Sequence, residues 1–403
     1  MKSLVLGTGL RVIMAPCPTD VVYCGIAVDS GTRDELDTES GIAHFTEHLS
    51  FKGTTHLTSR QIITRMETVG GDLNAFTGKE ETVYYCTCQK EHIGRALKLL
   101  ADIVTNSTYP QDEMDKEVEV VIDEIESYND SPSELIYDDF EAILFNGHQL
   151  GRNILGNAER LRQFKTKDII AYTRRMYQPN RMVLFVYGNV DERVVMKYAE
   201  TLPISTIPSA DDRITPSPFG ECKSVTISKD THQAHVMMGA RAFGGNDKRH
   251  LALFLANNIL GGPGLSSRLN LSLREKHGLV YTVDSSITTY TDTGVWAVYL
   301  GCDKDDVNRC QRLVSKELDR MVQSPLSDRA LSAAKRQLVG QIVLSYDNFE
   351  NVAIGMGKRL LHYDRTQTRQ ELCERIMTLQ SEEILEACRE VFNPDRLTTL
   401  IYR

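Results

Sequence analysis

Three side chains that could build a metal site lie within five consecutive residues, His44-Phe45-Thr46-Glu47-His48. Successive residues of a helix are about 100° apart, so His44, Glu47 and His48 would project from one face. Neutral imidazoles bind zinc, and a catalytic zinc needs three protein ligands and an open position for water. Glu47 would lie beside the water that it deprotonates. Chance could produce the cluster, but the flanking residues are nearly all apolar, and burying three unpaired polar groups is costly.

The third ligand is expected from a second helix, predicted for Glu113 to Asp130. Its apolar residues form a broad arc, and Glu117 and Glu124, one heptad apart, fall inside that arc while the other charged residues gather on the solvated side. A buried salt bridge is one explanation for these two acids. The other is a metal ligand, Glu124, with Glu117 steering the site. The second explanation predicts one Zn²⁺ per chain, bound by His44, His48 and Glu124.

These helices belong to a chain that divides almost in half. The stretch from Leu202 to Gly220 holds four of the twelve prolines and has no helical or strand periodicity, which is typical of an interdomain linker. We place the first domain at residues 1–205, the linker at 206–220 and the second domain at 221–403. Strand and helix patterns alternate in both halves, which predicts an α/β or α+β fold. The strand patterns are Arg11 to Ala15, Val21 to Val28, Thr82 to Cys88, Met182 to Val186, Ser224 to Ser228, His235 to Gly239, Val295 to Leu300 and Leu397 to Tyr402.

The two halves resemble copies of one unit. The apolar pattern that begins at Gly41 matches the pattern that begins at His250 without a gap, and ESYND from Glu126 falls on LSYDN from Leu344. In this alignment every candidate metal or base residue of the first half is replaced in the second. We therefore predict one working site per chain and a supporting role for the second half. The replacing residues are Leu253, Ala256, Asn257, Lys335 and Ile342.

Composition narrows the class of partner and compartment. The net charge of −9 argues against nucleic acid or an anionic membrane as the main partner, while cationic peptides stay plausible ligands. The nine cysteines are scattered without a repeated spacing, which fits reduced thiols better than a disulfide framework. No apolar stretch reaches the length of about 18 residues that a membrane span needs, and no signal-peptide pattern opens the sequence. We expect a cytoplasmic protein that is neither exported nor anchored.

Four ordered motifs resemble the family of pitrilysin, insulin-degrading enzyme and mitochondrial processing peptidase, whose zinc motif is the inverted H-x-x-E-H. They are HFTEHLSFKGT from His44, GGDLNAFTGKEETVYY from Gly70, KEVEVVIDEIES from Lys116 and SSRLNLSLREKHGLVYTV from Ser266. The resemblance implies an α+β fold of two homologous domains. Each would be a mixed, mostly antiparallel sheet packed with helices, and together they would form half of a clam-shell chamber. The length resembles the short members, which assemble as dimers.

Carried over to these motifs, the resemblance implies the same metal site: His44, His48 and Glu124 bind zinc, Glu47 is the general base and Glu117 is the supporting catalytic acid.

The resemblance also implies substrate-binding residues. Asn74 and Ala75 match an edge strand that pairs with an extended peptide. Arg274 and Tyr281 match a pair from the non-metal half that holds the substrate carbonyl, and both side chains are hydrogen-bond donors that can stabilise an oxyanion. Without the resemblance, Asn74 would be interpreted as a turn or strand-end residue, and Arg274 and Tyr281 as a surface arginine and a core tyrosine.

The predicted function is hydrolysis of peptide bonds in extended peptides by a zinc endopeptidase. Two alternatives stay open, a non-catalytic scaffold subunit of the same fold and a metallohydrolase that acts on another kind of bond. Because the metal motif and the Arg/Tyr pair occur in one chain, we expect a homodimer, with a heterodimer of paralogues as the alternative.

Overall fold

The computed structural model describes residues 1–203, 213–217 and 222–403 and divides them into two compact units. Unit 1 comprises Met1–Ser127, Arg152–Arg213 and Tyr346–Thr368, and unit 2 comprises Tyr128–Gly151, Ile214–Ser345 and Arg369–Arg403. The linker predicted at 206–220 lies outside the described residues except for 213–217.

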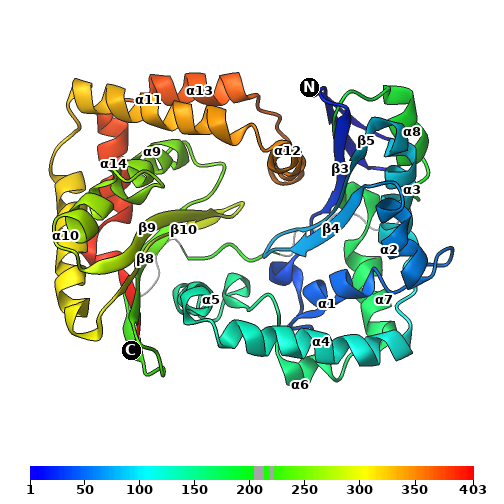
Figure 1. Cartoon of the computed structure of the whole chain (residues 1–403), viewed down its shortest axis with the longest axis horizontal. Coiled ribbons are helices and arrows are strands. Elements are labelled where there is room, and N and C mark those ends of the chain that lie inside the picture. Colours follow the sequence, from blue (N-terminus) through cyan, green and yellow to red (C-terminus); the bar gives the residue numbers. More distant parts are fainter. Residues whose placement is uncertain (204–212, 218–221) are drawn as a thin grey trace. The chain divides into compact units, whose positions relative to one another are not determined.

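Unit 1 is built on a six-stranded sheet with the order β1-β2-β6-β3-β5-β4 (Figure 1). Only the β2–β6 pair is parallel, so the sheet is mixed and mostly antiparallel. The strands are β1 Lys2–Val5, β2 Arg11–Ala15, β3 Val21–Val28, β4 Asp72–Thr77, β5 Thr82–Gln89 and β6 Met182–Tyr187.

Residue alternation along these strands directs two sets of side chains to opposite faces of the sheet. On β3, Val22, Cys24 and Ile26 join a core with the helices of the N-terminal half, whereas Ala27 joins a second core on the other face. The helices of the first core are α1 Ile42–Leu49, α2 Ser59–Glu67, α3 Ile93–Asn106, α4 Gln111–Asn129, α6 Ala158–Leu161, α7 Thr166–Met176 and α8 Glu192–Ala199.

The second face of this sheet is covered by α12, Phe349–Tyr363, which comes from the C-terminal half of the chain (Figure 1). The Phe185 ring fills the space between sheet and helix: a Cβ at Gly25 on β3 would lie 2.4 Å from this ring, and a Cβ at Gly357 on α12 would lie 2.5 Å from it. The Arg11 guanidinium also donates to the carbonyls of Leu360 and Leu361, at 3.1 and 3.0 Å, at the end of α12. This helix is therefore an integral part of unit 1.

Unit 2 repeats the same plan with a five-stranded sheet in the order β7-β11-β8-β10-β9. Here β7 and β11 are the parallel pair, as β2 and β6 are in unit 1. The strands are β7 Ser224–Ile227, β8 Ala234–Phe243, β9 Val280–Thr289, β10 Thr293–Cys302 and β11 Thr398–Tyr402. The matching order confirms the prediction of an α+β fold with two homologous domains.

One face of the second sheet packs against α5, Pro132–Leu144, which comes from the N-terminal half. On the other face, Trp296 of β10 contacts the Phe392 ring, with centroids 4.4 Å apart, and donates its indole N–H to Asn257 at 3.0 Å. Each unit thus takes one helix from the other half of the chain. The further helices of unit 2 are α9 His250–Gly261, the π-helix η5 Asn270–Glu275, α10 Val307–Gln323, α11 Asp328–Ser345, α13 Arg369–Thr378 and α14 Ser381–Val391.

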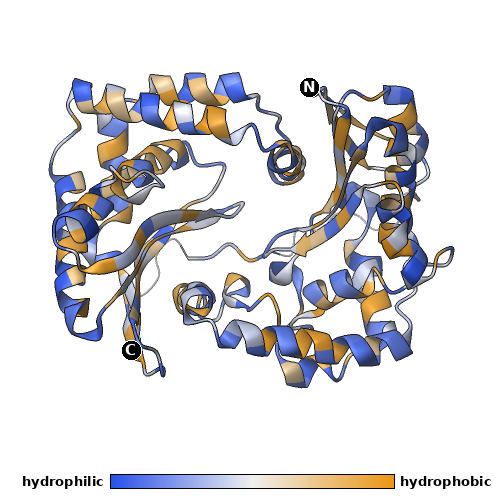
Figure 2. Ribbon diagram, viewed as in Figure 1, coloured by the Kyte–Doolittle hydropathy of each residue, from blue (hydrophilic) through white to orange (hydrophobic). Residues whose placement is uncertain are grey.

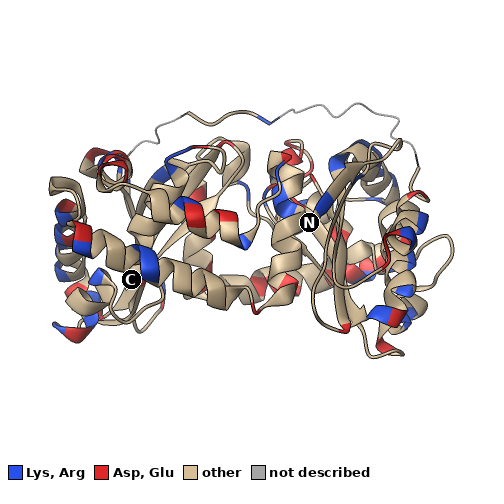
Figure 3. Ribbon diagram, turned by 90° about the horizontal axis from the view of Figure 1, so that it is seen from above, with Lys and Arg blue, Asp and Glu red and all other residues tan. Residues whose placement is uncertain are grey.

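The helices of both units are amphipathic, with polar and apolar residues interspersed along them. Figure 2 shows hydrophilic and hydrophobic residues alternating along the helices of both units. Lys and Arg are interspersed with Asp and Glu on these helices (Figure 3). Among the described residues, no helix combines the length and the apolar character that crossing a bilayer requires.

Candidate metal centre

Helix α1 carries the H-x-x-E-H motif and is anchored on all sides. Its residues Ile42, Phe45 and Leu49 are fully buried in the core of unit 1. At its start, the Glu35 carboxylate accepts the N–H groups of Gly41 and Ala43, at 3.1 and 3.0 Å, which satisfies donors that a helix N-terminus leaves free. Burial raises the pKa of Glu35 to about 8 against the opposing effect of these two bonds. The two histidines therefore project from a rigid helix.

The structure brings three candidate ligands together from two helices, His44 and His48 of α1 and Glu124 of α4. Their ligand atoms all lie within 4.8 Å of one another. Glu124 Oε2 is 3.8 Å from His44 Nε2 and 3.5 Å from His48 Nε2. Ligands bonded to one tetrahedral zinc at about 2.0 to 2.2 Å lie about 3.3 to 3.6 Å apart. The donor set suits zinc, and the separations of 3.5 and 3.8 Å are close to those that a tetrahedral zinc requires.

The two imidazoles differ in their surroundings. Burial lowers the pKa of His44 to about 3, and nearby His48 adds to the effect, so His44 is neutral at pH 7 as a metal ligand must be. Burial also acts to lower the pKa of His48. The hydrogen bond to Glu117 and the charges of Glu47 and Glu124 outweigh it, so the pKa of His48 is raised in the metal-free protein.

Glu117, two helical turns before Glu124 on α4, orients His48. Its Oε1 lies 3.0 Å from His48 Nδ1, and its Oε2 lies 2.5 Å from the Lys52 ammonium. Burial acts to raise the pKa of Glu117, but its bonds to His48 and Lys52 hold the pKa below its ordinary value. An ionised Glu117 that accepts the Nδ1 proton leaves the Nε2 lone pair of His48 for a metal.

Glu124 differs from the expectation that both acids of α4 lie on a buried face. The Glu117 side chain is 9% exposed, but the Glu124 side chain is 45% exposed. Val120, expected in the same apolar arc, is 51% exposed. The core contacts of α4 come instead from Met114, Val118, Val121 and Ile122. The ligand cluster therefore has a buried side formed by α1 and an open side at Glu124, where water has access.

Glu47, the expected base, lies beside this cluster and is 8% exposed. Thr77, the last residue of β4, donates its hydroxyl proton to Glu47 Oε2 at 2.6 Å. Burial raises the pKa of Glu47, whereas the Thr77 hydroxyl and the charge of His48 oppose that rise. A carboxylate whose pKa is raised by burial is suited to accept and release a proton near neutral pH.

The predicted substrate-binding residues lie in different units. Asn74 and Ala75 lie on β4, which is at the edge of the unit 1 sheet as expected. In unit 2, Arg274 is exposed on η5, and Tyr281 is 58% exposed on β9 with its hydroxyl donating to Asp303 at 3.0 Å. Tyr281 is thus a surface residue, and the roles of all four stay predictions.

Sequence reasoning missed the contacts made by Lys52, Thr77 and Glu35. Lys52 lies in the turn after α1, where the helical period no longer indicates which side chains meet. Thr77 lies two residues after Ala75 on the edge strand, so the two side chains are on the same face of the sheet. No pattern pointed to Glu35, which reaches α1 from the loop that precedes it.

Comparison with known proteins finds one family model for each of two consecutive parts of the chain. The model described as Insulinase (Peptidase family M16) matches residues 11–158, and the model described as Peptidase M16 inactive domain matches residues 163–338. The chain is 30% identical over 402 residues to "Uncharacterized zinc protease YmxG" of Bacillus subtilis, a match that covers 100% of this chain and 98% of the relative. It is 32% identical over 391 residues to a protein of Mycobacterium leprae that is also named an uncharacterized zinc protease, covering 96% and 88%.

Two solved structures share the fold. A protease from Helicobacter pylori superimposes with a TM-score of 0.89 at 22% identity, covering 100% of this chain and 99% of the other. A peptidase M16 inactive domain from Pseudomonas fluorescens superimposes with a TM-score of 0.91 at 19% identity, covering 100% and 97%.

Proposed function

We propose that this chain, which belongs to the insulinase family of peptidases (family M16), is a zinc metalloendopeptidase that hydrolyses internal bonds of extended peptides or small unfolded polypeptides. The observation that carries the proposal is the meeting of His44, His48 and Glu124 from two helices, with a buried carboxylate, Glu47, beside them. The relatives' names as zinc proteases support the choice of metal.

In this proposal, His44, His48 and Glu124 hold one zinc ion per chain. When bound, zinc supplies a water of lowered pKa and polarises the carbonyl that is attacked. Glu47 would accept a proton from the attacking water on its carboxylate, which Thr77 holds by donating to Oε2. It then delivers the proton to the nitrogen of the leaving amine. Glu117 acts through His48 by keeping the imidazole in one tautomer.

The substrate is proposed to pair with β4 as an added strand. An edge strand presents unpaired backbone donors and acceptors, and strand addition lets a site accept many sequences as long as the peptide is extended. In this proposal, Asn74 and Ala75 supply that edge, and Arg274 and Tyr281 of the second half donate to the substrate carbonyl. The active protein is proposed to be a cytoplasmic homodimer, and a heterodimer with a paralogue is the alternative.

A scaffold role is the competing proposal, because residues 163–338 match a model described as an inactive domain. The first half, which matches the other model, keeps both histidines and all three acids of the site. That complete set favours catalysis over a purely structural role.

The test is a paired measurement of bound zinc and peptide hydrolysis on wild type and Glu47→Gln. The variant keeps all three ligands, so we expect full zinc content and a loss of activity of about two to four orders of magnitude. Glu119→Gln is the matched control, because Glu119 lies on α4 with its side chain 63% exposed and pairs with Arg162 at 3.4 Å. Wild-type activity in Glu47→Gln would remove Glu47 from the reaction, and wild-type protein without zinc would favour the scaffold role.

A further inference from the structure

The geometry points to Thr77 as a positioning residue that fixes the carboxylate of the general base, Glu47, and ties it to the strand proposed to receive the substrate. This inference rests on the proposed peptidase function. Its basis is the bond of 2.6 Å from the Thr77 hydroxyl to Glu47 Oε2.

The hydrogen bond from Thr77 restricts rotation of the Glu47 carboxylate about its side-chain torsions. A glutamate side chain has several rotatable bonds, and the end of Glu47 is buried at 8% exposure beside His48 and Glu124. A hydroxyl that donates to Oε2 limits rotation of the carboxylate, and so fixes the directions in which its oxygens can accept a proton. Threonine is suited to this task because its branched Cβ restricts the side chain to few rotamers on a strand.

Thr77 has a fixed position because it immediately precedes a clamped turn, residues 78–81, between β4 and β5. Within this turn, Gly78 N–H donates to the Glu81 carbonyl at 2.7 Å. From the neighbouring loop, Thr32 N–H donates to the Gly78 carbonyl at 3.3 Å and Arg33 N–H donates to the Lys79 carbonyl at 2.8 Å. Gly31 permits this approach, because a Cβ there would lie 2.4 Å from the Gly78 oxygen.

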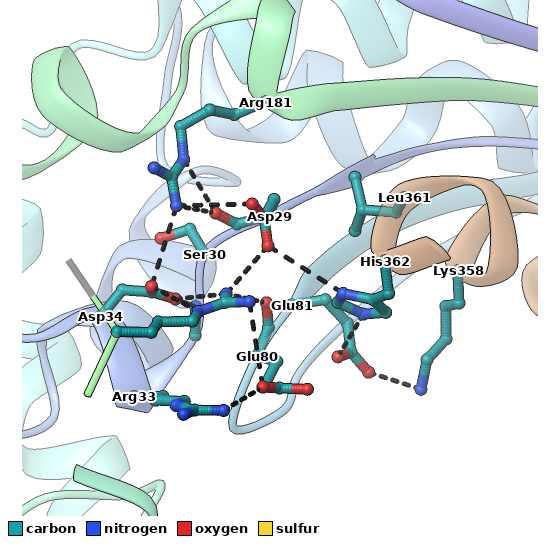
Figure 4. Close-up of polar contacts among 12 residues, drawn as sticks. Asp29, Ser30, Arg33, Asp34, Glu80, Glu81, Arg181, Lys358, Leu361 and His362 are labelled. Carbon is teal, nitrogen blue, oxygen red and sulfur yellow. Dashed lines mark hydrogen bonds and ion pairs between the residues drawn. The ribbon is translucent and has the colours of Figure 1, made fainter. Parts of the chain in front are cut away.

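The acids of the turn are held by basic side chains (Figure 4). Glu80 pairs with Arg33 at 2.6 Å, and these side chains are 4% and 0% exposed. Glu81 lies 3.0 Å from His362 Nε2 and 2.5 Å from the Lys358 ammonium, both on α12. Removing either partner of a buried pair leaves an uncompensated charge, so these contacts resist movement of the turn.

The loop that follows β3 and Arg213 also belong to this cluster of charged residues. The Arg213 guanidinium lies 2.8 Å from both Asp29 Oδ1 and Asp34 Oδ2 and donates to the Glu80 carbonyl at 2.9 Å. Arg181 donates to the Asp29 carbonyl at 3.0 and 2.7 Å. The turn next to Thr77 is thus braced by several segments of unit 1.

The consequence is a fixed relation between base and substrate. Thr77 has its backbone in β4, which would pair with the peptide, and its hydroxyl on Glu47. One residue therefore sets both where the peptide backbone lies and where the proton acceptor points. A misplacement of about 1 Å in such an arrangement can cost about 100-fold in rate.

The test compares Thr77→Val with Thr77→Ser in the full-length, zinc-loaded protein. Valine keeps the branched shape but removes the hydroxyl, so we expect kcat to fall about 10- to 100-fold while KM and zinc content stay as in wild type. Serine retains the hydroxyl and should recover most of the lost kcat. Thr87→Val on β5 is the matched control, since the Thr87 hydroxyl also donates to a glutamate, Glu350, at 2.9 Å.

A stability cycle checks the contact without turnover. If Thr77 bonds Glu47, the shifts in Tm caused by Thr77→Val and Glu47→Leu will not add in the double variant, because each substitution removes the same hydrogen bond. Additive shifts would overturn the inference. So would wild-type kcat in Thr77→Val, equal losses in Thr77→Val and Thr77→Ser, or a change confined to KM. Absence of hydrolysis by wild type would instead overturn the proposed function, and the role of Thr77 with it.

Discussion

Lys52 is expected to affect metal affinity, because two contacts connect it to His48, a proposed zinc ligand. Its ammonium lies 2.5 Å from Glu117 Oε2, and Glu117 Oε1 lies 3.0 Å from His48 Nδ1. The Lys52→Met variant keeps most of the aliphatic stem and its packing but removes the charge. Glu117 then has one partner fewer for a carboxylate that is 7% exposed.

The expected size of the effect follows from these contacts. A hydrogen bond to a charged group is worth about 1.5 to 3 kcal/mol, and about 1.4 kcal/mol corresponds to tenfold in a dissociation constant. Because the Lys52 side chain is 25% exposed, water replaces part of the lost bond, and only part of the remainder reaches His48. We therefore expect zinc affinity to fall about 10-fold, at the lower end of the about 10- to 100-fold that outer contacts of metal ligands contribute.

The assay is competition for zinc against a chromophoric chelator, at constant pH and ionic strength. Lys116→Met is the control, because Lys116 lies on the same ligand-bearing helix α4 but its side chain is 68% exposed and pairs with Glu113 at the surface. An identical zinc Kd for Lys52→Met and Lys116→Met would refute the reasoning that Lys52 supports the ligand His48 through Glu117.

Two other predictions concern the scaffold of unit 1. Phe185→Ala should lower the free energy of unfolding by about 3 to 5 kcal/mol, measured by urea denaturation, because its ring fills the space beside Gly25 and Gly357; a loss below about 1 kcal/mol would contradict that packing. Burial acts to raise the pKa of Glu81, but His362 and Lys358 bring it down to about 2 from its ordinary 4.5, so its stabilising effect is present above pH 4.5 and is lost as pH falls towards 2. The free energy of unfolding should be measured for metal-free wild type and Glu81→Gln between pH 4.5 and pH 2. The difference between the two proteins should shrink as the pH falls, and a constant difference would contradict the stabilising role of ionised Glu81.

The elements with strong hydrophobic patterns were predictable from the sequence. The strand predicted at Arg11 to Ala15 is β2, and the helix predicted from Glu113 to Asp130 is α4 with slightly shifted ends. Strands β1 and β9 escaped prediction, and both are edge strands. An edge strand such as β9, VYTVDSSITT, is partly solvated, so its residues lack the apolar alternation of a central strand.

The exchange of helices between the halves could not be predicted. Periodicity shows that α5 and α12 have an apolar face but does not say which sheet covers it, and the alignment of the halves suggested no crossing. The steric fit of Gly357 against Phe185 depends on residues far apart in the sequence.

For the candidate site, too, part of the geometry could be predicted from the sequence and part could not. The helical period was enough to predict that His44 and His48 share one face of α1, and the structure brings Glu124 close to both. The reason for choosing Glu124, a place on the buried face of α4, was wrong, because its side chain is 45% exposed. The contacts of Thr77 with Glu47 and of Lys52 with Glu117 join separate elements, so only the folded chain brings them together.

The central claim is that one zinc ion is bound by two imidazoles and a carboxylate, with a position left for water. X-ray absorption at the zinc K edge of the purified protein loaded with one equivalent of zinc tests this most directly. The account predicts four nitrogen and oxygen neighbours, with bonds of about 2.0 to 2.2 Å and no sulfur. Since the chain has nine cysteines, a sulfur shell at about 2.3 Å would show that zinc is bound elsewhere and would contradict the claim.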